Sequence, residues 1–163
     1  MDDGDVKSLR SVELAGKRVL IRADLNVPID AGQVISDAAV YENYATFPEE
    51  REQLLQRLHD ERIEGVLFLS GDRHHTEISR LERDNAYPLI DITCSPLTAG
   101  THAARDEGNT LQVKGTTFYD RNVGIMGITG KYGNRQLMLT IYDEQGEPVF
   151  DYAIEQQELK YTD

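Results

Sequence analysis

The sequence predicts an α+β fold in which a mostly antiparallel sheet carries one main amphipathic helix. Three observations support this prediction: a single leucine stripe at helical spacing, two short apolar runs after it, and apolar residues that alternate near the C-terminus. With 163 residues, the chain has the length of one domain with a buried core.

The N-terminal segment holds the first predicted strand. Arg18 to Arg22 is a short apolar run bounded by charged residues, which is typical of a strand. The strand ends before Pro28, because proline donates no hydrogen bond to a ladder and holds the preceding residue in an extended conformation. Asp30 to Gln33 has the composition of a turn.

The main helix is predicted to begin at Thr46, an N-cap residue that is followed three residues later by Glu49. Its apolar stripe and its polar opposite face indicate a helix of about three to four turns that packs on a sheet. Gly65 is the predicted stop signal. The stripe consists of Leu54, Leu55 and Leu58.

Two apolar runs in the middle of the chain predict buried strands. The first, Gly65 to Ser70, is too short for an independent helix. The second runs from Pro88 to Pro96, with prolines at its ends, where a strand tolerates them. Between them, the charged stretch Glu77 to Asn85 is predicted to form a turn. Residues 98–110 are predicted to form a long loop.

Alternating residues near the C-terminus predict a meander. Thr117 to Thr129 supplies its first strand. Residues 137–142 and 149–154 are joined by a glycine-containing turn, which predicts a hairpin. The last segment, Glu155 to Asp163, is predicted to be a polar tail.

Composition and charge restrict the classes of partner. The net charge of −12 argues against nucleic acid and anionic membranes as partners, because both require basic patches. Cys94 is the only cysteine, which excludes an intrachain disulfide and a thiolate metal cluster. The first residues are acidic where a signal peptide is basic, and no apolar run has transmembrane length. We therefore expect a cytoplasmic protein with no membrane partner.

The residues that follow the first apolar run form the candidate site. Asp72 and His74 come after Gly71, at the predicted carboxyl end of a strand, where α/β sheets commonly present ligands and metals. A carboxylate oxygen and an imidazole nitrogen suit zinc or another transition metal better than calcium alone. Arg73 is placed to pair with a phosphate oxygen or to form a surface salt bridge. His75 is expected to point away from the site.

Five segments in the second part of the chain carry distinctive motifs. They are Tyr41–Arg51, Leu69–His74, Ser95–Gly100, Arg121–Gly124 and the closing hairpin. In this order they resemble the C-terminal part of PhoD-like alkaline phosphatases, over about Val40 to Ile154. The resemblance implies a metal-dependent phosphoesterase of the calcineurin-like superfamily, in which this region forms one half of a two-sheet sandwich. Members of this family are often exported.

The same resemblance implies a set of site residues. By it, Asp72 and His74 are catalytic and are the last ligands of a two-metal centre. Arg73, between them, is our candidate for binding phosphate, and we interpret Asn122, in the matched Arg-Asn-x-Gly motif, as a structural hydrogen-bonding residue near the site. The implied cofactors are divalent or trivalent metal ions, namely calcium, iron, zinc or manganese, and the implied substrate is a phosphate ester. The family takes its other ligands from an N-terminal half whose motifs are missing here, so a protein without bound metal is the alternative.

A second resemblance covers the N-terminal segment. Leu14 to Asp37 resembles the opening strand of phosphoglycerate kinases, in which the residues matching Asp24 and Asn26 touch the substrate. Kinase activity is excluded, because the sequence has no glycine-rich phosphate loop and no nucleotide-binding half. We predict two joined parts, residues 1–37 and 38–163, that form one compact domain. The junction between the two parts has two possible origins, a natural recombination and an engineered fusion.

Two function classes follow from these patterns. The first is a metal-dependent phosphoesterase that uses Asp72 and His74, in a truncated or chimeric form with an incomplete two-metal site. The second is a non-catalytic, self-associating domain that keeps the fold. Half of a sandwich exposes an apolar sheet face, so a homodimer or higher oligomer is expected. If the first strand replaces a lost phosphatase strand, Asp24 approaches the pair and rebuilds part of the metal site.

Overall fold

The structure, a computed structural model, describes residues 21–22, 47–101 and 109–162. These residues include seven strands, one α-helix and one 3-10 helix. The predicted α+β class, with one helix and mostly antiparallel strands, is confirmed. In chain order the elements are β1 (Ile21–Arg22), α2 (Pro48–Asp60), β2 (Leu67–Ser70), β3 (Glu77–Arg83), β4 (Ala86–Thr93), β5 (Asn122–Lys131), β6 (Asn134–Asp143), β7 (Pro148–Glu155) and η2 (Gln156–Leu159).

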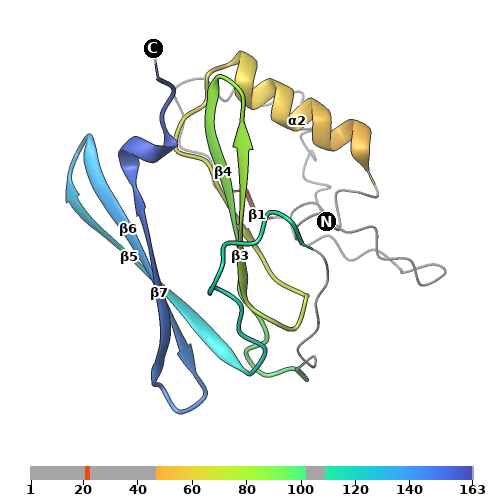
Figure 1. Ribbon diagram of the computed structural model, residues 1–163, viewed down its shortest axis with the longest axis vertical. Helices are drawn as coiled ribbons and strands as arrows, with labels where there is room; N and C mark the ends of the chain where they lie inside the picture. The colour runs from red at the N-terminus through yellow and green to blue at the C-terminus, as the bar shows by residue number, and fades with distance from the viewer. Residues whose placement is uncertain (1–20, 23–46, 102–108, 163) are drawn as a thin grey trace, which may run out of the picture.

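The strands form two sheets. The first has the order β1-β2-β4-β3 and the second the order β5-β6-β7. Figure 1 shows the two sheets side by side, with α2 on the side of the first sheet that faces away from β5–β7. In the first sheet β1 pairs with β2, and β2 with β4, in parallel. The carboxyl ends of these three strands therefore lie at the same edge of the sheet.

Both sheets contribute to one apolar core. The first sheet supplies fully buried Ile78 and Ile90, and the second supplies Leu139 and Ile141. The alternation predicted for residues 137–142 is correct, since Leu139 and Ile141 are buried while their neighbours are only partly so. β4 is buried along almost its whole length, as expected of a strand covered on both faces.

Helix α2 packs on the core through Leu54 and Leu58. Its N-cap residue is Phe47, so the predicted N-cap at Thr46, which lies outside the described residues, is wrong by one position. Pro48 begins the first turn, where its missing N–H costs nothing. The helix ends at Asp60, earlier than predicted from Gly65. Within the described ranges, no helix is long and apolar enough to cross a membrane.

The predicted turn over Glu77 to Asn85 is wrong, because most of this stretch forms β3, which pairs antiparallel with β4. Its charged side chains are compatible with a strand because they have partners: Arg80 pairs with Glu82 at 2.6 Å and with Glu158 at 3.1 Å.

The start of β5, at Asn122, is also later than predicted. Residues 117–121 are not part of that strand.

The predicted polar tail is wrong as well. After β7 the chain forms η2, and Leu159 and Tyr161 are buried in the core. The Tyr161 hydroxyl donates to the Leu58 carbonyl at 3.1 Å, and its backbone N–H donates to the Glu64 carboxylate at 3.1 Å. These contacts fasten the C-terminal residues to the end of α2 and the segment after it.

Candidate functional site

The candidate site lies at the edge where the parallel strands of the first sheet end. β1 ends at Arg22, β2 at Ser70 and β4 at Thr93. The Cys94 N–H donates to the Ser70 carbonyl at 3.0 Å, which keeps the segments after β2 and β4 adjacent. The turn that carries Asp72 and His74 follows β2 directly.

This turn has an unusual backbone. Asp72 has φ 71° and His74 has φ 59°, both in the left-handed region that side chains other than glycine rarely adopt. The Arg73 N–H closes the turn by donating to the Gly71 carbonyl at 2.9 Å. Such conformations persist only where the surrounding structure holds them, and they are frequent at functional sites. Both candidate ligands are presented by this strained turn.

The ring of His74 is oriented by a backbone carbonyl. Its Nδ1 donates to the Gly100 oxygen at 2.5 Å. A carbonyl oxygen only accepts, so Nδ1 carries the proton and the lone pair of the neutral ring is on Nε2. Metal-ligating histidines are usually held in this way, with the other ring nitrogen donating to a carbonyl or carboxylate. Asp72, two residues earlier, is exposed at the same turn.

A buried ion-pair network joins the turn to β3. Glu77 is 3% exposed and accepts hydrogen bonds from Arg73 Nη1 at 2.9 Å and from Asn109 Nδ2 at 2.9 Å. His75 Nε2 lies 3.7 Å from the Glu77 carboxylate. Burial alone would raise the pKa of Glu77, but the contact with His75 and the charge of Arg73 hold that pKa below its ordinary value. The network fixes both residues that flank His74.

Arg73 and His75 therefore have structural contacts. Of the two roles considered for Arg73, a salt bridge is observed, and with its side chain 11% exposed this bridge is largely buried rather than on the surface. Binding of phosphate by Arg73 stays a prediction. His75 is buried and donates from Nδ1 to the Arg73 carbonyl at 3.1 Å. Its ring lies against the ring of Tyr119, with 5.3 Å between the two ring centroids.

Asn122 belongs to a buried hydrogen-bond network at the start of β5. Its Oδ1 accepts from the Thr76 hydroxyl at 2.6 Å. Its Nδ2 donates to the carbonyls of Ser95 at 3.1 Å and Asp120 at 2.8 Å. Asn122 thereby ties the second sheet to the segments that follow β4 and precede β3.

The described residues supply part of a metal site. Asp72 and His74 are ligands of suitable type, and the orientation of His74 fits a metal on Nε2. No group of three or more histidine, cysteine, aspartate or glutamate side chains that could hold a metal ion occurs among residues 21–22, 47–101 and 109–162. Asp24 and Asn26 lie outside these ranges. The described residues alone thus do not complete the site.

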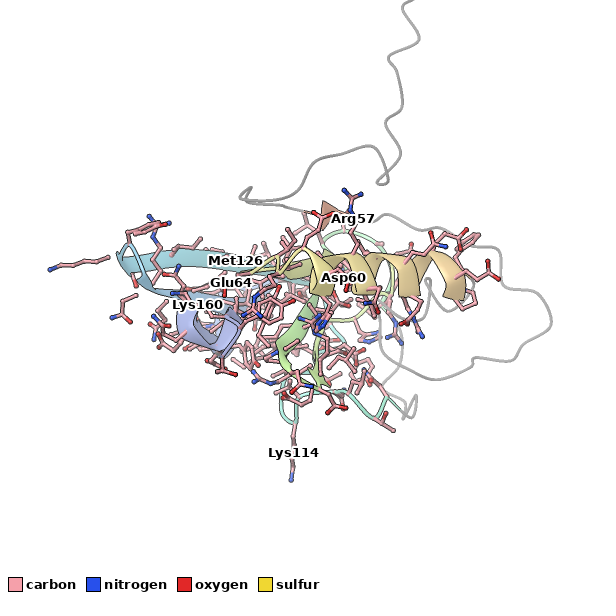
Figure 2. The ribbon with its side chains drawn as sticks, turned by 90° about the horizontal axis from the view of Figure 1, so that it is seen from above. Arg57, Asp60, Glu64, Lys114, Met126 and Lys160 are labelled. Carbon is pink, nitrogen blue, oxygen red and sulfur yellow. The ribbon has the colours of Figure 1, made fainter. Side chains whose placement is uncertain are left out.

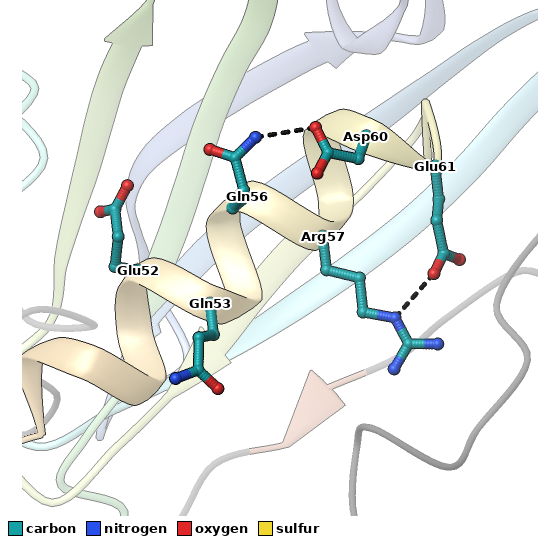
Figure 3. A pocket seen from close by; sticks show the side chains of 6 residues that line it. All are labelled: Glu52, Gln53, Gln56, Arg57, Asp60 and Glu61. Carbon is teal, nitrogen blue, oxygen red and sulfur yellow. Dashed lines mark hydrogen bonds and ion pairs between the residues drawn. The ribbon is translucent and has the colours of Figure 1, made fainter.

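The outer surface of α2 also carries several acidic and polar side chains, but these side chains pair with one another along the helix. Gln56 donates to Asp60, and Arg57 pairs with Glu61, each at 2.7 Å and four residues apart along the helix (Figure 3). Pairs of this spacing stabilise an exposed helix by a few tenths of a kcal/mol. We interpret this face as a solvated helix surface.

Two buried carboxylates at the site edge were not predicted as site residues. The charged stretch around Glu77 predicts a turn, and one of its partners, Asn109, lies 32 positions further along the chain, whereas Arg73 and His75 directly precede β3. Asp91 is 3% exposed in β4 and accepts from the Ser70 hydroxyl at 3.0 Å. A carboxylate inside the apolar run from Leu89 to Ile92 was the available signal for Asp91.

Comparison with known proteins identifies a family. The family model described as PhoD-like phosphatase matches residues 15–136. This range includes the candidate site and crosses the proposed boundary between residues 37 and 38. It also covers most of the segment that resembles phosphoglycerate kinases, and that second resemblance stays a prediction. The search of solved structures found no match.

Proposed function

Because the chain belongs to the PhoD-like phosphatase family, we propose that it is a metal-dependent phosphoesterase whose Asp72 and His74 supply part of a two-metal site. Family membership supports a phosphoesterase-type function with a phosphate ester as substrate, and phosphatases of this family are metal-dependent in general. The metal is calcium, iron, zinc or manganese, and the site is incomplete in the described residues.

The observation that carries this proposal is the orientation of His74. Its Nδ1–H···O bond to Gly100 directs the lone pair to Nε2, on a turn whose strain is maintained by the buried Arg73–Glu77 pair. A metal held there would act as a Lewis acid on a phosphoryl oxygen. The protein residues contribute by fixing the ligand geometry and by keeping His74 in the required tautomer.

The register of β1 supports Asp24 as a further ligand. Ile21 is opposite Phe68 and Arg22 is opposite Leu69, in parallel, so the chain leaves β1 at the edge where Asp72 follows β2. Asp24 comes two residues after the end of β1, and Asn26 four. We propose both as further members of the site, in a chimeric chain whose parts are residues 1–37 and 38–163.

Hydrolysis assays test this proposal. In the presence of manganese, zinc or calcium, the wild-type chain is expected to hydrolyse 4-nitrophenyl phosphate or its bis-ester, and His74→Ala and Asp24→Ala are expected to lose this activity. His59→Ala, which removes an exposed histidine on α2, is the matched control and is expected to retain it. Equal turnover in His74→Ala and wild type would contradict a catalytic role for His74.

A second candidate function is a non-catalytic, self-associating domain. It is favoured by the apolar side chains that β5 exposes, among them Ile125 at 57% and Ile128 at 66%. Exposed apolar groups of this kind are characteristic of association surfaces. No turnover and no bound metal, together with a dimeric or larger particle, would favour this function over the enzyme.

A further inference from the structure

Strand β5 exposes more large apolar side chains than any other described element. Val123, Ile125, Met126 and Ile128 are all exposed. They occupy both faces of the strand, because successive side chains alternate. Met126 is opposite Leu139 in β6, and Ile128 is opposite Leu137, on the face that carries the core, whereas Val123 and Ile125 lie on the other face. Figure 2 labels Met126 on β5.

The same strand is an unprotected edge. Among the described residues β5 pairs only with β6, over ten residues and with a continuous register. Sheet edges are usually protected by charged residues, prolines or bulges. Residues 122–130 contain no charged residue and no proline, and the pairing with β6 has no bulge. This edge therefore offers a long row of backbone groups for another strand.

Two glycines in β5 differ in their surroundings. A Cβ atom at Gly124 would lie 3.1 Å from the Cys94 sulfur and 3.2 Å from Ile141 Cδ1, so packing within the chain explains this glycine. Gly127 has no atom within 4 Å of the corresponding position and no left-handed φ. Glycine inside a strand is destabilising relative to alanine and often marks a close approach of another backbone.

We propose that a second copy of this chain pairs antiparallel with β5 around a two-fold axis at Met126. This register places Ile125 opposite the partner's Gly127 and Gly124 opposite the partner's Ile128. Each glycine then faces a large side chain, and the two three-stranded sheets form one sheet of six. The proposal rests on the self-association described above and is independent of phosphatase activity.

Charge also favours β5 as the contact between copies. Each copy carries a net charge of −12, so most surfaces of two copies repel each other. No acidic residue occurs between Arg121 and Gly133. In the proposed register Arg121 lies opposite the partner's Lys131. The ion pair of Arg121 with Glu144 of the same copy, at 3.7 Å, weakens the repulsion between these two cations. The β5 edge is thus a segment along which two acidic copies can approach.

Disulfide trapping tests the register. In Met126→Cys the two introduced thiols face each other across the two-fold axis, and mild oxidation is expected to convert most of the protein into a covalent dimer. In Thr129→Cys each thiol faces the partner's Val123, and the two thiols are separated by roughly 20 Å, six strand residues. This variant and the wild type, which contains only Cys94, are the controls and are expected to stay largely monomeric on a non-reducing gel.

Three outcomes would overturn the proposal. The first is a monomer of unmodified protein in sedimentation across a wide concentration range. The second is equal crosslinking of Thr129→Cys and Met126→Cys. The third is a dimer in sedimentation without crosslinking of Met126→Cys, which would leave self-association intact but place the interface elsewhere. Circular dichroism establishes that each variant is folded, and phosphate ester hydrolysis is measured separately.

Discussion

Replacing Glu77 by glutamine is expected to lower the free energy of unfolding by about 3 kcal/mol at pH 7, because removing one member of a buried ion pair leaves the other charge uncompensated. Glu77 is 3% exposed, and its carboxylate accepts hydrogen bonds from Arg73 and Asn109 at 2.9 Å each. Glutamine keeps the volume but removes the charge. Chemical denaturation followed by circular dichroism measures the change.

The pH dependence separates this effect from a packing defect. The folded-state pKa of Glu77 lies below its ordinary value, so its contribution is present above the unfolded pKa of about 4.3 and is lost as the pH falls through the folded pKa. The difference between wild type and Glu77→Gln is therefore expected to shrink in acid. Glu82→Gln, an exposed residue of the same strand with an ion pair to Arg80, is the matched control and should cost at most about 1 kcal/mol. Equal losses in the two variants would contradict the account.

Asn122→Ala is expected to destabilise the protein by about 3 kcal/mol without changing metal affinity. The substitution leaves the Thr76 hydroxyl and the Ser95 and Asp120 carbonyls without their present partner inside the protein. Each buried polar group left unsatisfied costs about 1–3 kcal/mol. Denaturation and metal titration of the same samples measure the two effects.

The control for Asn122→Ala is Asn134→Ala, which removes an exposed asparagine at the start of β6. We expect this change to alter stability by less than about 0.5 kcal/mol. A loss of metal binding in Asn122→Ala with unchanged stability would assign Asn122 to the metal site rather than to the network that joins the sheets.

The predictable part of the fold consists of elements whose signal is local. The leucine stripe of α2, the apolar run of β4 and the alternation of β6 each report a buried face directly, and all three elements are observed. β3 is not predictable in this way, because its charged side chains favour a turn in the sequence alone. They are compatible with a strand only through partners such as Glu158, far along the chain. Tyr161 was assigned to a polar tail because its burial depends on Leu58 and Glu64.

The same distinction applies to the site. Asp72 and His74 were identifiable because they follow an apolar run directly, at a predicted strand end. The contact of His74 with Gly100 spans 26 positions and has no sequence signal. The role of Glu77 likewise has no sequence signal, because its partner Asn109 lies in a predicted long loop. Local patterns indicate candidate ligands, whereas the groups that orient them come from tertiary structure.

Metal affinity measured on the complete chain tests the central claim, that His74 is a metal ligand. Equilibrium dialysis against manganese and zinc is carried out with wild type, His74→Ala and the exposed control His59→Ala. Loss of a residue that only orients a ligand typically costs 10–100-fold in affinity, so we expect the loss of His74 itself to cost at least about 100-fold. We predict metal binding by wild type and His59→Ala and strongly weakened binding by His74→Ala. Equal affinities of wild type and His74→Ala would contradict it.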